Sequence, residues 1–107
     1  GPGAARRARA IITNPTHIAV AIKYNPEDEV APIIVAMGSG SIADRIIKIG
    51  LENNIPIMRN VDLARELYSK GKISDYIPED LYEPVAEILK WIESLEENPD
   101  INMELLK

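Results

Sequence analysis

The 107-residue chain contains no cysteine and a single histidine, His17. Without cysteine, a disulfide framework, a thiolate zinc site and a cysteine nucleophile are all excluded. One histidine is too few for an all-histidine metal site or a HExxH protease motif. No apolar run approaches the ~18 residues needed to cross a bilayer, and no signal-peptide core follows the basic start. We therefore expect a soluble domain that uses neither a metal nor a cofactor.

The composition is that of one globular domain, with 46% hydrophobic and 27% charged residues. The net charge is −5, yet the first ten residues carry only three charges, all positive: Arg6, Arg7 and Arg9. The acidic remainder of the chain argues against nucleic-acid binding through a broad basic face. The three arginines are either a solvated arm or a contact with anionic lipid.

The hydrophobic pattern predicts a small mixed sheet. Four strands are expected, over residues 11–13, 17–24, 33–37 and 55–58. The second of them alternates isoleucine or valine with alanine, so its alanine face should be tightly covered. The last two strands flank a helical segment, which favours parallel pairing between them through a right-handed crossover.

Helical spacing appears in three places and predicts three main helices. One follows the break at Gly38–Gly40, one follows a cap at Asn60, and the last follows Pro78. Ser41 and Asp44 have the spacing of a capping box for the first helix. A fourth, short helix is expected over residues 101–107. The predicted fold is thus α/β, with about four strands flanked by about four helices.

The chain divides by composition into four parts. We expect a cloning remnant at residues 1–3, a basic linker arm at 4–10, the folded domain at 11–97 and a polar tail at 98–107.

The motif with distinctive chemistry is the tetrapeptide Asn14–His17, between the first two expected strands. An asparagine ordinarily degrades when the next backbone N–H attacks its side chain, but Pro15 has no N–H. The remaining route is attack of the Asn14 side-chain nitrogen on the Asn14 main-chain carbonyl. This attack closes a succinimide and expels Pro15 as a new amino terminus. A turn clamped between two strands would favour it, because well-oriented intramolecular attack contributes about 7–11 kcal/mol.

The neighbouring residues supply further candidates for this chemistry. Thr16 is a candidate hydrogen-bond partner inside the turn, and His17 is a candidate proton relay to the departing proline nitrogen. Backbone N–H groups of the turn could stabilise the oxyanion. The same four residues also fit an ordinary turn that Asn14 starts and Thr16 caps. The motif alone therefore does not distinguish self-cleavage from a plain structural turn.

The segment from Asn14 to Tyr24, NPTHIAVAIKY, resembles the FlhB/YscU family of flagellar and type III secretion export-apparatus proteins. The resemblance covers about residues 11–95 and includes AP at 31–32, ADRI at 43–46, ENNIPI at 52–57, LARELY at 63–68 and IPEDLY at 77–82. Lys23-Tyr24 and Glu52–Asn54 favour a flagellar member, although Ile18 is more usual in injectisome members.

The resemblance implies the cytoplasmic domain of a bacterial inner-membrane protein whose membrane-spanning part precedes the basic arm. Members of this family cleave themselves once between the asparagine and proline of the motif, here Asn14 and Pro15, supported by Thr16 and His17. The two pieces stay associated, and export switches from rod and hook subunits to filament subunits. The implied partners are other export-gate membrane proteins and secreted rod- or hook-type substrates.

Two other functions remain open. The domain could be a non-catalytic docking module for export substrates and gate components, in which cleavage is secondary. It could also bind a small phosphorylated ligand at Gly38–Ser41, because a helix that follows glycines can bind phosphate. That segment, however, lacks the lysine of a Walker motif and the full dinucleotide spacing.

Overall fold

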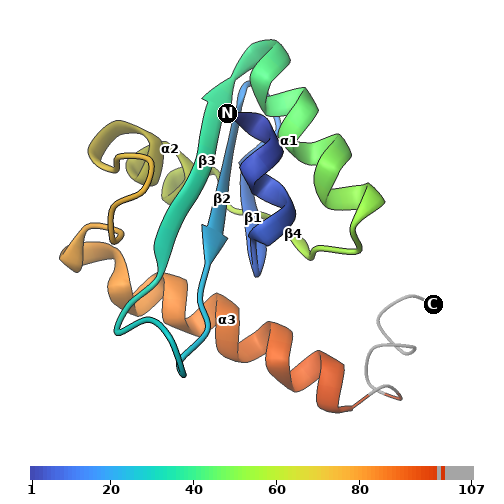
Figure 1. The fold of residues 1–107 in the computed structure, drawn as a ribbon, viewed down its shortest axis with the longest axis vertical. Coiled ribbons are helices and arrows are strands. Elements are labelled where there is room, and N and C mark those ends of the chain that lie inside the picture. The colour runs from blue at the N-terminus through green and yellow to red at the C-terminus, as the bar shows by residue number, and fades with distance from the viewer. Residues whose placement is uncertain (99, 101–107) are drawn as a thin grey trace.

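A computed structural model describes residues 1–98 and residue 100 of the chain, and Figure 1 shows its fold. The elements follow in this order: the 3-10 helix η1 (Pro2–Arg7), strands β1 (Ala10–Asn14), β2 (Ile18–Lys23) and β3 (Ile33–Ser39), helix α1 (Gly40–Glu52), strand β4 (Ile57–Arg59), helix α2 (Val61–Lys70), the 3-10 turn η2 (Glu79–Leu81) and helix α3 (Tyr82–Glu97). The predicted α/β fold with a four-stranded mixed sheet is confirmed. The helix expected over 101–107 lies outside the described residues.

The sheet has the strand order β3-β2-β1-β4. β2 is antiparallel to both β1 and β3, whereas β4 pairs parallel with β1. The expected pairing of strand 33–37 with strand 55–58 is therefore wrong. The two strands do run parallel, but β2 and β1 lie between them, because the β1–β2 hairpin occupies the centre of the sheet.

Each face of the sheet has its own hydrophobic core, as the alternation in β2 predicts. Val20 and Ile22 face a core that α2 and the start of α3 complete. Ala19 and Ala21 face the other side, where η1 and α1 pack closely on the small side chains. Ala5 of η1 is fully buried in this second core, so the expected basic arm is packed against the domain at that residue.

Several local predictions need correction. Ser41 lies inside α1 rather than at its N-cap, and no side chain makes a capping hydrogen bond there, so Ser41 and Asp44 form no capping box. β3 continues to Ser39 instead of ending before Gly38. The last helix starts with the short turn η2 after Pro78, and α3 proper begins at Tyr82.

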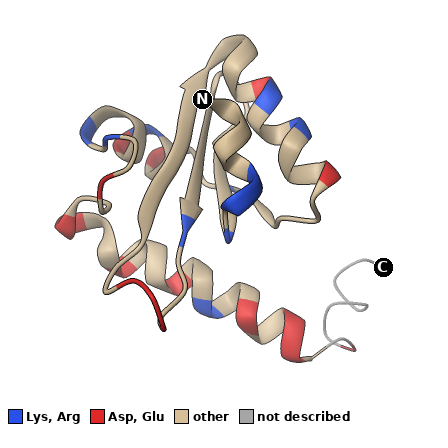
Figure 2. Ribbon diagram, viewed as in Figure 1, with Lys and Arg blue, Asp and Glu red and all other residues tan. Residues whose placement is uncertain are grey.

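The charge distribution follows these elements. Basic residues mark η1 and acidic residues mark both ends of α3 in Figure 2. Arg9, just after η1, forms an ion pair with Glu96 near the end of α3. Across residues 1–98 and 100, no helix is both long enough and apolar enough to cross a membrane.

Candidate functional site

Asn14 is the last residue of β1, and Pro15, Thr16 and His17 form the turn that leads into β2. We call Asn14–His17 the NPTH turn. Asn14 is only 7% exposed and pairs across the hairpin with Ile18, whereas the other three residues of the turn are exposed. The structure thus places the four candidate residues together, with the asparagine clamped by the sheet and the rest accessible to water.

The side chain of Asn14 has a fixed orientation. Its Oδ1 accepts hydrogen bonds from the Thr16 backbone N–H at 3.2 Å and from Thr16 Oγ1 at 2.7 Å. A backbone N–H can only donate, so this contact identifies the bonded atom as the amide oxygen. No hydrogen bond from Asn14 Nδ2 occurs within the described part of the chain. The nitrogen required for cyclisation is therefore the unengaged end of the amide.

The main-chain carbonyl of Asn14 is also oriented. Its oxygen accepts a hydrogen bond from the His17 backbone N–H at 3.1 Å, which closes a four-residue turn. Cyclisation of Asn14 would turn this oxygen into an oxyanion. A fixed backbone donor at that position is the arrangement by which oxyanion holes stabilise acyl-transfer transition states.

Two backbone contacts join the NPTH turn and the preceding Thr13 to the first residue of α1 and the N-cap of α2. The Gly40 N–H donates to His17 O at 2.9 Å, which anchors the start of α1 on the turn. The Asn60 N–H donates to Thr13 O at 3.0 Å, and Asn60 Oδ1 caps α2 by accepting from the Leu63 N–H, as the sequence predicted. The turn and the residue before it are therefore held by hydrogen bonds from the segments that follow β3 and β4, on either side of the hairpin.

The glycines before α1 have structural reasons to be there. A Cβ on Gly38 would lie 2.2 Å from Ile42 Cγ2, and Gly40 has a φ of +57°. Glycine is the residue that adopts such positive φ values without steric cost. These two glycines let α1 begin directly against the turn, which accounts for the segment Gly38–Ser41 without a phosphate ligand.

A pocket of about 250 Å³ lies beside the NPTH turn. Its lining includes all four residues of the turn together with residues of α1, among them Asp44 and Ile47. Sequence reasoning did not connect α1 with the site, because the contact depends on the crossover from β3. The sequence signal for this contact was the Gly38–Gly40 break directly before a predicted helix.

The chain contains two further Asn-Pro bonds, at Asn25-Pro26 and Asn98-Pro99. Asn25 forms a similar turn, since its Oδ1 accepts from the Glu27 N–H at 3.1 Å. Its Nδ2, however, donates to Asp28 Oδ2 at 3.0 Å. The Nδ2 of Asn98 likewise donates, to Ser94 O at 3.0 Å. Asn14 differs from both in its burial and in its unengaged amide nitrogen.

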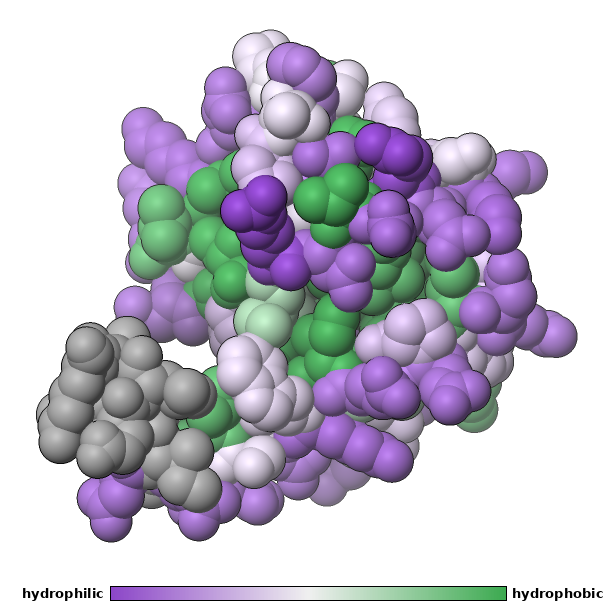
Figure 3. Space-filling model, turned by 180° about the vertical axis from the view of Figure 1, so that it is seen from behind, coloured by the Kyte–Doolittle hydropathy of each residue, from purple (hydrophilic) through white to green (hydrophobic). Residues whose placement is uncertain are grey.

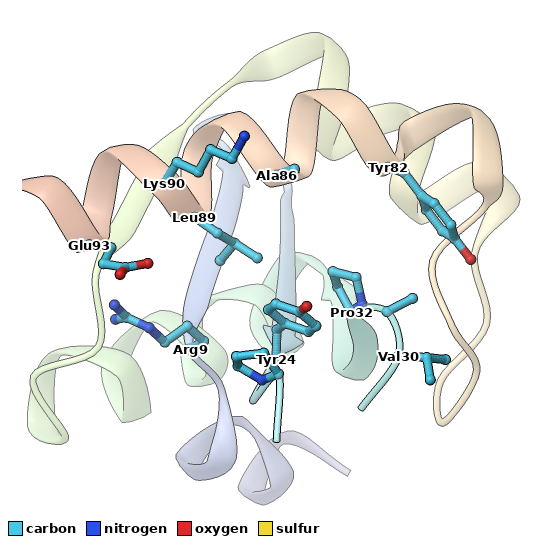
Figure 4. Close-up of a pocket in the computed structure, with 11 residues that line it drawn as sticks. Arg9, Tyr24, Val30, Pro32, Tyr82, Ala86, Leu89, Lys90 and Glu93 are labelled. Atoms are coloured by element: carbon cyan, nitrogen blue, oxygen red, sulfur yellow. The ribbon is translucent and has the colours of Figure 1, made fainter. Parts of the chain in front are cut away.

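A second, larger cavity of about 450 Å³ lies between α3 and the β2–β3 connection (Figure 4). Apolar and aromatic side chains form most of its wall: Tyr24, Pro26, Val30, Ala31, Pro32, Tyr82, Ala86 and Leu89. Arg9, Lys90 and Glu93 add charges at one end. Val30 is 86% exposed, an unusual state for a valine beside such a cavity. On the side of the molecule shown in Figure 3, hydrophilic side chains interrupt the apolar surface.

Comparison with known proteins identifies the class. Residues 3–92 match the model of the FlhB HrpN YscU SpaS family. The flagellar biosynthetic protein FlhB of Aquifex aeolicus is 45% identical over 86 residues, which are 80% of this chain and 25% of that protein. The chain therefore spans about a quarter of the length of this relative.

Solved structures agree with the sequence match. The crystal structure of the cytoplasmic domain of FlhB from Shewanella putrefaciens superposes with a TM-score of 0.86 at 32% identity, covering 92% of this chain and 76% of that one. An EscU C-terminal domain with an asparagine-to-alanine substitution superposes with a TM-score of 0.79 at 31% identity, covering 83% of this chain and 89% of that one. Another EscU structure carries an alanine in place of the proline that follows that asparagine.

These matches define an export-apparatus domain of the type III secretion class. The chain belongs to the FlhB HrpN YscU SpaS family, and its fold is that of the cytoplasmic domain solved for FlhB. The resemblance stated from the sequence is confirmed.

Proposed function

We propose that this domain cleaves itself once between Asn14 and Pro15 by asparagine cyclisation. Asn14 Nδ2 attacks the Asn14 carbonyl carbon, the bond to the Pro15 nitrogen breaks, and a succinimide ends the first piece. The proton lost from Nδ2 passes to the Pro15 nitrogen, and His17 is the relay within the turn. The reaction is intramolecular, so it runs once per molecule and needs no other substrate, cofactor or metal.

The observation that carries this proposal is the geometry at Asn14. Thr16 fixes the amide oxygen, so Nδ2 remains available, and the His17 N–H polarises the carbonyl under attack. Both effects are built into a turn that the sheet holds in place. Preorganised donors of this kind typically change rates by about 10²–10³-fold.

The position of β1 supports continued association of the two pieces after cleavage. β1 is an interior strand that pairs with β2 on one side and β4 on the other. All five of its residues are buried, including Ile11 and Ile12 in the two cores. A cut at Asn14 breaks the turn but leaves both ladders and both cores in place.

We further propose that cleavage switches the class of exported substrate, from rod- and hook-type to filament-type subunits. The cut replaces a constrained loop with two chain ends and a new charged amine on the domain surface. The setting would be the cytoplasmic face of the bacterial inner membrane, with other export-gate membrane proteins as neighbours. The family match and the FlhB relative support this assignment.

Intact mass under denaturing conditions tests the reaction on the purified domain. We expect two species, one ending at Asn14 and one starting at Pro15. Asn14→Ala should give a single full-length mass, and Asn25→Ala, at the second Asn-Pro bond, should cleave like wild type. A wild-type protein that stays at full-length mass after prolonged incubation would refute the proposed cleavage.

The cavity of Figure 4 favours a second function that is compatible with the first. An apolar hollow with charges at one end suits a segment that inserts an apolar side chain and carries polar neighbours. We propose that a short segment of a secreted rod- or hook-type subunit docks there. Calorimetry with such a subunit and the Asn14→Ala domain separates the two functions, because docking should persist without cleavage.

A further inference from the structure

The pocket beside the NPTH turn contains one carboxylate, that of Asp44. His17 is the other titratable side chain among its lining residues, and the rest carry no charge. Asp44 lies in the second turn of α1, and the Gly40–His17 hydrogen bond holds this helix on the NPTH turn. The fold therefore holds the backbone of Asp44 beside Asn14 and Pro15.

The carboxylate of Asp44 is exposed and has no structural role within the described part of the chain. Asp44 does not cap α1. It takes part in none of the hydrogen bonds or ion pairs among the described residues, and Lys48, one turn further along, does not pair with it. Asp44 is exposed, and no lysine or arginine stands among the described residues that line this pocket.

Cleavage would create a positive charge in this place. When the bond between Asn14 and Pro15 breaks, the proline nitrogen receives the proton that Nδ2 loses and becomes a secondary amine. An α-amino group has an ordinary pKa of about 8, so at neutral pH this amine takes up one further proton from water. An ammonium group then stands in the pocket that Asp44 lines.

We propose that Asp44 is the counter-ion of the Pro15 ammonium in the cleaved protein. This inference rests on the proposed self-cleavage. A carboxylate near the amine favours its protonated form. The protonated amine has no lone pair with which to attack the succinimide, so re-formation of the peptide bond is suppressed. The same ion pair holds the new amino terminus in the pocket, next to the end of β1.

The test measures the pKa of the Pro15 amine in the cleaved protein. Carbon-13 NMR of proline-labelled protein follows the Pro15 resonances during a pH titration. We expect Asp44→Asn to lower this pKa by about 0.2 to 0.7 units, which is about a 1.5- to 5-fold increase in the acid dissociation constant, because Asp44 is exposed and solvent screens the pair. Asp44→Glu should keep the pKa close to the wild-type value. Asp62→Asn, an exposed aspartate at the start of α2, is the matched control and should leave the pKa unchanged.

Each outcome either supports or overturns the counter-ion role of Asp44. An Asp44→Asn protein that cleaves and titrates like wild type overturns the counter-ion role while leaving self-cleavage intact. A wild-type protein that never cleaves overturns both. Asp44→Ser provides a second neutral variant, so that a folding defect in one of them does not obscure the result.

Discussion

Asn14 accepts two hydrogen bonds from Thr16 on the same side-chain oxygen, one from the backbone N–H at 3.2 Å and one from Oγ1 at 2.7 Å. The first sets the turn, and the second adds a donor that only serine or threonine can supply at this position. Together they point the amide oxygen into the turn. The orientation of the attacking nitrogen therefore depends on the residue two positions further along.

Removal of the Thr16 hydroxyl should slow cleavage without abolishing it. Thr16→Val keeps the backbone N–H bond and the side-chain shape but loses a hydrogen bond worth about 0.5–1.5 kcal/mol. If the whole of this hydrogen-bond energy is used in the transition state, its loss lowers the rate of cleavage by about 2- to 13-fold. The rate is measured as the loss of full-length mass in freshly refolded protein. Thr16→Ser retains the hydroxyl and should cleave at close to the wild-type rate; equal rates for the valine and serine variants would contradict this role.

The approach of α1 to the NPTH turn should depend on Gly38. A methyl group there would meet Ile42 Cγ2 at 2.2 Å, and overpacking of this kind costs about 1–3 kcal/mol. We expect Gly38→Ala to lower the free energy of unfolding by that amount and to slow cleavage, because α1 must shift away from the turn. Chemical denaturation and intact mass measure the two effects.

The clash also predicts its own rescue. Ile42 is 45% exposed, so its truncation removes little core packing. The double variant Gly38→Ala/Ile42→Ala removes the 2.2 Å contact but keeps the Cβ of residue 42, which lies 2.7 Å from the new methyl group, so it should recover only part of the lost stability and rate. Gly3→Ala, whose Cβ would meet nothing closer than Arg6 Nη1 at 3.9 Å, is the control and should behave like wild type. A double variant no better than Gly38→Ala would place the defect outside this contact.

The NPTH turn was predictable from the sequence because its chemistry is local. Pro15 closes the ordinary degradation route of Asn14, and the flanking hydrophobic alternation shows that two strands meet there. The two-faced packing of β2 was visible for the same reason, since alternating large and small side chains on one strand require two different cores.

The features that escaped prediction depend on long-range topology. Asp44 was assigned to a capping box because Ser41 lies three residues before it, yet the helix starts at Gly40 and Asp44 lines the pocket. The position of β4 beside β1 could not be read from the chain, because a strand–helix–strand unit does not reveal that a hairpin is inserted between its strands.

The ion pairs of Lys70 predict a small pH effect on stability. Its ammonium group donates to Asp80 at 2.9 Å and to Glu66 at 3.2 Å. The hydrogen bond from Lys70 lowers the pKa of Asp80 below its ordinary 3.8, and Asp80 is the main cause of the raised pKa of Lys70. A carboxyl group whose pKa is lowered by folding stabilises the fold above about pH 3.8. This stabilisation is lost as the pH falls through the pKa of the group in the folded state.

Lys70→Met should therefore lower the melting temperature slightly at pH 7 and not at all well below pH 3.8. The effect is small because the groups are exposed, and surface ion pairs contribute little. Thermal unfolding at the two pH values measures it, with Lys72→Met, an exposed lysine in the next loop, as the control. A Lys70→Met defect of equal size at both pH values would show that packing, not charge, is responsible.

Filling the cavity of Figure 4 should block docking and leave cleavage untouched. Ala86 lines the cavity from α3, whereas its neighbour Glu87 is exposed and does not line it. Ala86→Tyr places a ring in the hollow, and Glu87→Tyr adds the same ring on the outside of the helix. For a rod- or hook-type subunit that inserts an apolar side chain, loss of one buried contact of about 1.5–3 kcal/mol weakens binding by about 10- to 150-fold.

Calorimetry should show this loss for Ala86→Tyr alone, and intact mass should show wild-type cleavage in both variants. Equal binding by the two variants would exclude the cavity as the docking site, and a cleavage defect confined to Ala86→Tyr would mean that the two sites are coupled through the sheet.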